Sequence, residues 1–156
     1  MRRISRHLLV AGAALAFSAA AAADDYAVYE SDSSFQDVLE GLKLAIQERG
    51  MYINNVMHMG EMLERTGKDL GMDEVIYTNA ESVEFCSAVL SRKMTAEDPT
   101  RIVNCPFIIA VDTLPAQPDT TYVVHRTIAA EETAGSAVML VVADMLRSVA
   151  EGAVTW

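Results

Sequence analysis

The sequence lacks the short motifs that mark common enzyme active sites. No G-x-S-x-G turn surrounds its serines, as a hydrolase nucleophile would need. Its eight glycines occur singly, so no phosphate-cradling loop is present. Neither C-x-x-C nor C-x-x-C-H occurs, so nothing indicates a redox dithiol or covalently attached haem. An enzyme is therefore the least favoured class of function.

The chain has no central apolar run of the roughly 20 residues needed to cross a membrane. Its N-terminus instead has the parts of a secretory signal: a basic start, a short apolar run from Leu8 to about Phe17, and small residues at 21–23. We predict a signal peptide over residues 1–23 that is cleaved on export to the periplasm. A retained N-terminal anchor is the alternative. Residues 24–156 then suffice for a single domain.

Basic residues are scarce in the predicted mature chain. Three of the 12 Lys and Arg residues precede residue 24, which leaves nine, whereas all 22 acidic residues follow it. The resulting net charge of −13 disfavours binding to nucleic acid or anionic lipid. It favours cations or a basic partner protein, such as a periplasmic cytochrome. Solubility alone would explain the charge equally well.

Cysteines are few as well, and the only two are Cys86 and Cys105. An even number of cysteines in an exported protein predicts a disulfide between them. A bridge that closes a loop of about 20 residues would stabilise the fold by roughly 3 kcal/mol on the chain-entropy model. Two separate buried thiols, or a pair of thiolate ligands, are the alternatives.

Hydrophobic periodicity predicts an α+β fold. The clearest element is an amphipathic helix over residues 33–50, with Ser34 at its N-cap and Gly50 at its end. The remaining patterns predict strands at 26–31, 51–59, 74–80, 101–114 and 120–129, and helices at 60–71, 80–94 and 136–151. This order predicts a compact single-domain sandwich, with a mainly antiparallel sheet and helices packed on one face.

Three segments resemble a small bacterial family, the domain of unknown function 302. They are SFQDVLEGLKLAIQERGMYI, VIYTNAESVEFCSAVLS and NCPFIIAV, which in this order are similar to the family's opening helix, its central strand with asparagine, and its strand opened by a Cys-Pro pair. The resemblance covers roughly residues 26–127. It implies an α+β fold that commonly forms homodimers, and no agreed activity. The segment HMGEMLERTGKDLG departs from the small residues that other members often have there.

Four of the nine methionines and one of the three histidines lie in the stretch MYINNVMHMGEM, residues 51–62. In a straight strand, His58 would face away from its methionine neighbours. Only a strand-to-helix junction near Gly60 could bring His58 together with Met59 and Met62. His125 would join them if the strands that carry the two histidines were neighbours, and otherwise it is an edge histidine.

Imidazole and thioether ligands together suit copper, particularly Cu(I), so the sequence predicts a soft-metal site at these four residues. Haem b is a weaker prediction. Met62 would share one helix face with His58 and could not lie on the opposite side of one iron, so haem would need His58 alone or His58 from two chains. Methionines that simply fill the core are the alternative to any cofactor.

Two hypotheses follow for the function. The first is a periplasmic binding or accessory domain that holds copper or haem for an envelope redox system. The second is a cofactor-free dimeric interaction module whose acidic surface meets a basic partner. The visible spectrum and the metal content of the exported protein would separate them.

Overall fold

The computed structural model describes residues 25–156, so the predicted signal peptide lies outside the described residues. The chain forms one antiparallel sheet in the order β1-β5-β4-β3-β2. Its strands are β1 (Tyr26–Ser31), β2 (Tyr52–Met57), β3 (Asn79–Cys86), β4 (Phe107–Leu114) and β5 (Gln117–Arg126). Its helices are α1 (Phe35–Glu48), α2 (Met59–Leu70), α3 (Ala88–Glu97), η1 (Pro99–Asn104), α4 (Ala130–Gly135) and α5 (Ala137–Val154). The predicted α+β class with an antiparallel sheet is confirmed.

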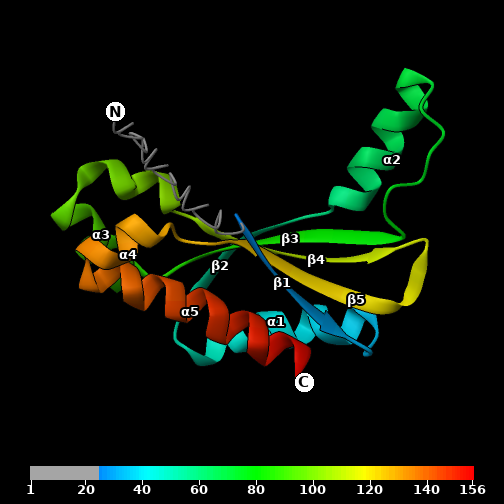
Figure 1. Cartoon of the computed structure of the whole chain (residues 1–156). Helices are drawn as coiled ribbons and strands as arrows, with labels where there is room; N and C mark the ends of the chain where they lie inside the picture. Colours follow the sequence, from blue (N-terminus) through cyan, green and yellow to red (C-terminus); the bar gives the residue numbers. More distant parts are fainter. Residues whose placement is uncertain (1–24) are drawn as a thin grey trace, which may run out of the picture.

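Helices α1 and α5 cover one face of the sheet (Figure 1). In α1, Val38, Leu39, Leu42 and Ile46 are buried, as their helical spacing predicts. The helix begins where expected, because the Ser34 side chain accepts a hydrogen bond from the Asp37 backbone N–H. These side chains pack with Val142 and Val149 of α5 against the inward residues of β3, β4 and β5, and so form the core.

The contact between α1 and α5 is close because it is made by small residues. A Cβ atom added at Gly41 would lie 3.2 Å from the Ala153 carbonyl oxygen, and one added at Gly152 would lie 3.3 Å from the Ala45 Cβ atom. Arg49, which caps the end of α1, donates hydrogen bonds to the Ala45 carbonyl at 2.7 Å and to the Ser148 carbonyl at 3.0 Å. The guanidinium thereby ties the end of α1 to α5.

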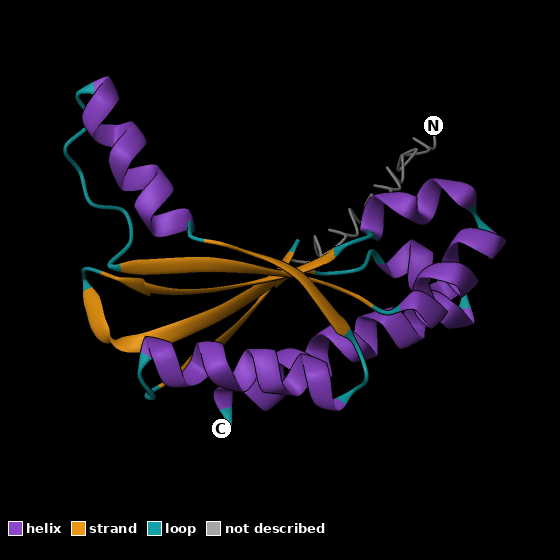
Figure 2. Cartoon of the chain, turned by 180° about the vertical axis from the view of Figure 1, so that it is seen from behind, coloured by secondary structure: helices purple, strands orange, loops and turns teal. Residues whose placement is uncertain are grey.

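Within residues 25–156, no such pair of helices covers the opposite face of the sheet (Figures 1 and 2). Helix α2 rises from one end of the sheet on this side, away from α1 and α5. After α2 the chain returns through residues 71–77 without regular structure and enters β3. We call residues 59–77 the arm, and the outward side of the five strands the open face.

Two local predictions were wrong in ways that alter the open face. Residues 80–86 belong to β3, not to a helix, because Val83 and Phe85 point into the core while Ser82 and Glu84 point outward, a period of two. In β2 the register shifts between Ile53 and Asn55, and this bulge reverses the faces predicted beyond it.

Among residues 25–156, no helix is long and apolar enough to cross a membrane.

Candidate interaction surface

The predicted metal residues His58, Met59 and Met62 do lie together at the junction of β2 and α2. His58 is the N-cap residue of α2, and its carbonyl accepts a hydrogen bond from the Met62 N–H at 3.2 Å. Its Nδ1 atom lies 3.1 Å from the Glu81 Oε1 atom, and its side chain is 62% exposed. Met59 and Met62 are half-buried. This part of the predicted set is therefore close in space.

His125 does not join that group. Strands β5 and β2 are separated by β4 and β3, so the neighbouring strands that this prediction required do not occur. Three strand spacings correspond to about 14 Å. His125 is buried on the helix side, where its ring stacks on Tyr29 and its Nδ1 atom lies 2.8 Å from the Arg126 carbonyl oxygen. The four-residue site was wrong in this respect.

A metal site at His58 would need thioether ligands. Within residues 25–156, no group of three or more His, Cys, Asp or Glu side chains could hold a metal ion. The methionines of the stretch also differ in environment, because Met51 is buried in the core whereas the β2 bulge leaves Met57 41% exposed. Copper or haem at His58 stays a prediction.

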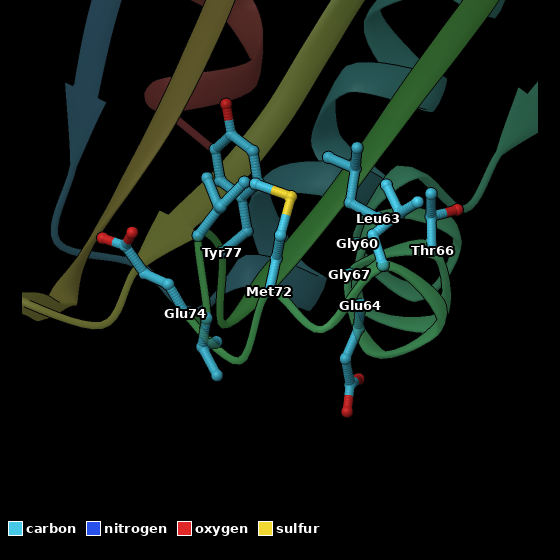
Figure 3. A pocket seen from close by; sticks show the side chains of 11 residues that line it. Gly60, Leu63, Glu64, Thr66, Gly67, Met72, Glu74 and Tyr77 are labelled. Carbon is cyan, nitrogen blue, oxygen red and sulfur yellow. The ribbon is translucent and has the colours of Figure 1, made fainter.

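A groove runs along the inside of the arm, between α2 and the returning segment (Figure 3). Its volume is about 230 Å³ and its lining is mainly apolar. Leu63, Met72 and Tyr77 line it, while the carboxylates of Glu64 and Glu74 point away from these side chains. All residues that line the groove belong to the arm.

Glycine allows the two sides of the arm to approach each other. A Cβ atom at Gly67 would lie 2.8 Å from the Met72 carbonyl oxygen, while the Met72 N–H donates to the Gly67 carbonyl at 2.8 Å. At its base, a Cβ atom at Gly60 would lie 3.0 Å from the Ala80 nitrogen, in β3. Larger side chains at either position would push the returning segment or β3 away.

The arm exposes its apolar side chains. Although α2 is amphipathic, none of its residues is buried. Four large apolar residues of the arm are more than half exposed: Leu70 at 68%, Met72 at 62%, Val75 at 58% and Ile76 at 54%. Contiguous apolar surface of this kind marks an interaction site more often than a free surface.

The open face presents a second apolar surface. Strand pairing places Val28, Val124, Ala110, Ser82 and Met57 in one row across all five strands. Val28 and Met57 of this row are large and exposed, and the other large exposed side chains of the open face are Tyr26, Tyr52 and Ile108.

Charges on the open face are mostly acidic. Glu30, Glu84 and Asp112 point outward with a single basic residue, Arg126, which lies 5.3 Å from the centre of the Tyr26 ring. Burial raises the pKa of the Asp112 carboxyl above its usual value. The open face is therefore an apolar surface with an acidic border.

A sequence model of the family described as Domain of unknown function DUF302 matches residues 27–151. The chain belongs to this family. Among solved structures, the crystal structure of an uncharacterized conserved DUF302 protein from Bacillus stearothermophilus is similar, with a TM-score of 0.65 and 14% sequence identity. The match covers 83% of this chain and 96% of that chain, and at this identity it shows the shared fold alone. No curated protein matches the chain.

The two cysteines of this DUF302 chain lie side by side. Cys86 ends β3, and Cys105 follows η1 just before β4. Their Sγ atoms are 3.2 Å apart, beyond the roughly 2.05 Å of a disulfide bond, so the structure holds them as thiols. The predicted bridge stays a prediction.

Sequence reasoning missed the arm as a surface. The helix predicted at 60–71 has an apolar stripe of Met62, Leu63, Thr66 and Leu70, but within residues 25–156 none of the residues of α2 is buried. Two signals were present: the apolar stripe, and the residues Leu70, Met72, Val75 and Ile76 gathered just beyond it. Neither signal indicates whether the apolar side of the helix packs on its own chain or on another chain.

Proposed function

We propose that this DUF302 chain is an interaction module that forms a homodimer through its arm and its open face. The observation that carries the proposal is the exposed arm, because among residues 25–156 four of its large apolar side chains are more than half exposed. Each copy carries both a projecting apolar element and an apolar sheet surface. A second copy is the simplest partner that would cover both.

The dimensions support this pairing. Helix α2 has 12 residues, which corresponds to a length of about 18 Å. Five strands have four spacings between them, so the sheet is about 19 Å wide. An arm laid across the open face of a second copy would therefore cross the whole sheet.

With twofold symmetry, the apolar surfaces of both copies would be covered in the same dimer. In an isologous dimer, the arm of one copy covers the open face of the other, and the same contact is made a second time. Exposed Val75 and Ile76 would meet the row that contains Val28 and Val124. The homodimers implied by the family resemblance agree with this arrangement.

Charge opposes this dimer and gives it a distinctive salt dependence. The arm carries five acidic and two basic residues, and the open face carries three acidic residues and one basic residue. Both surfaces are therefore negative, and salt screens their repulsion. A complex with a basic protein such as a cytochrome would behave in the opposite way, because salt weakens attraction between unlike charges.

Sedimentation of the purified, reduced protein in dilute salt and in about 1 M sodium chloride tests the proposal, since the screening length falls to about 3 Å in the latter. We expect a mass twice that of the chain, and a dimer dissociation constant that decreases as salt is added. A monomer at all concentrations and at both salt levels would contradict the proposal. Salt-sensitive binding of an added basic cytochrome by that monomer would favour the partner hypothesis.

A second candidate function is the binding of Cu(I) at His58 in an exported accessory protein. The supporting observation is the contact between the His58 Nδ1 atom and the Glu81 carboxylate, because such a carboxylate commonly orients a histidine whose other nitrogen binds metal. We expect one Cu(I) per chain in an anaerobic titration against a chromogenic Cu(I) chelator, at least about tenfold weaker in His58→Ala. The matched control is His125→Ala, which leaves this junction unchanged. Equal affinity in His58→Ala and the parent protein would rule out this site.

A further inference from the structure

The thiols of Cys86 and Cys105 lie close together because the chain leaves the sheet after β3 and returns to it at β4. Helices α3 and η1 occupy the residues between them, and the cysteines flank this segment at the end of β3 and the start of β4. Both are half-buried, so neither sulfur is sealed in the core. Closing their 3.2 Å separation to a bond of about 2.05 Å requires a movement of only about 1.2 Å.

The surroundings of the two sulfurs are unequal. The Cys105 Sγ atom lies 3.0 Å from the hydroxyl oxygen of Ser91, the fourth residue of α3. Cys105 therefore lies beside the first turn of this helix, in contact with a hydroxyl group. Burial, followed by the hydrogen bond with Cys105, raises the pKa of the Cys86 thiol to about 11.

We propose that Cys86 and Cys105 form a reversible dithiol–disulfide site that exchanges with small disulfides such as oxidised glutathione, with Cys105 as the attacking thiol. The Cys105 thiolate attacks one sulfur of the small disulfide, forms a mixed disulfide and releases one small thiolate. Cys86 then loses its proton and attacks the Cys105 sulfur, which releases the second small thiolate. Two protein thiols are oxidised to one disulfide, and one small disulfide is reduced to two thiols.

The raised pKa of Cys86 supports this division of roles. A raised pKa lowers the thiolate fraction of Cys86 at neutral pH, so Cys86 should attack an external disulfide more slowly than an ordinary cysteine. Within the pair, Cys86 has instead the position of the resolving thiol, 3.2 Å from the sulfur it would attack.

The test treats the reduced, purified protein with oxidised glutathione at neutral pH and follows its mass. We expect the parent protein to lose two hydrogens and both alkylatable thiols, and dithiothreitol to reverse this without denaturant. We expect Cys86→Ser to accumulate one glutathione adduct. Cys105→Ser should form its adduct more slowly than Cys86→Ser does. Circular dichroism confirms that both variants are folded.

A second measurement needs no variant. With iodoacetamide well below the protein concentration, most of the label on the parent protein should be found on Cys105. Label found mainly on Cys86, or adducts that form equally fast in the two variants, would overturn the assignment of roles. A dithiol that persists in excess oxidised glutathione, or a bridge that dithiothreitol reduces only in denaturant, would overturn the reversible site itself.

Discussion

Val75→Glu is expected to weaken the proposed dimer at least about thirtyfold. Val75 is 58% exposed on the returning segment of the arm, where the proposed interface would cover it. A carboxylate placed there would be buried without a partner, at a cost of about 2 kcal/mol or more, which corresponds to this factor. Sedimentation equilibrium across a dilution series measures the dissociation constant.

The matched control is Val103→Glu. Val103 is 84% exposed on η1, outside both the arm and the open face, so the same change of side chain and charge leaves the proposed interface unaltered. We expect its dissociation constant to stay within about threefold of the parent value. Equal weakening by the two variants would mean that added charge, and not the arm, governs association.

Leu42→Ala is expected to lower the free energy of unfolding by about 2–5 kcal/mol. Leu42 is fully buried at the centre of α1, against the inward face of the sheet, so its removal takes apolar contacts from the core and leaves a cavity. Chemical denaturation at a fixed protein concentration measures the change, because any dimer also contributes to stability.

Leu140→Ala provides the comparison for that measurement. Leu140 lies on α5 and is 53% exposed, so the same truncation on a helix removes few buried contacts. We expect a loss below about 1 kcal/mol. If Leu42→Ala cost no more than Leu140→Ala, the packing described for α1 would be wrong.

The sequence predicted α1, β4 and β5 well, because their buried residues recur at the spacing of a regular helix or strand. Helix α1 shows its apolar stripe, its N-cap at Ser34 and its terminal glycine at Gly50. The strands predicted at 101–114 and 120–129 contain most of β4 and β5, which pair with each other. Each of these signals is local and consistent with its neighbours.

The region of β2, β3 and α3 was predicted poorly, because its apolar residues fit helical spacing as well as the alternation of a strand. Val83, Cys86, Val89 and Leu90 fit helical spacing, but β3 ends at Cys86 and α3 begins at Ala88. The bulge in β2 depends on pairing with β3, which local sequence does not specify. Strand order likewise decided the position of His125, and no local pattern encodes that order.

The candidate sites depend on contacts that span long stretches of sequence. The Cys86 and Cys105 sulfurs meet because β3 and β4 are paired and the chain between them folds back through α3 and η1. Without a C-x-x-C motif, local sequence could not indicate two thiols that the fold brings together. The arm is similar, since its exposure depends on where β2 and β3 end.

The most direct measurement for the arm and the open face is photo-cross-linking between two isotopically distinct copies. Ile76→p-benzoylphenylalanine would be prepared as heavy-labelled protein, mixed with unlabelled parent protein, irradiated and digested. The proposed dimer predicts cross-links from heavy arm peptides to unlabelled peptides of β1 and β5, which contain Val28 and Val124. Cross-links confined to peptides of one isotope, at concentrations where the mixture is fully exchanged, would contradict an interface between two copies.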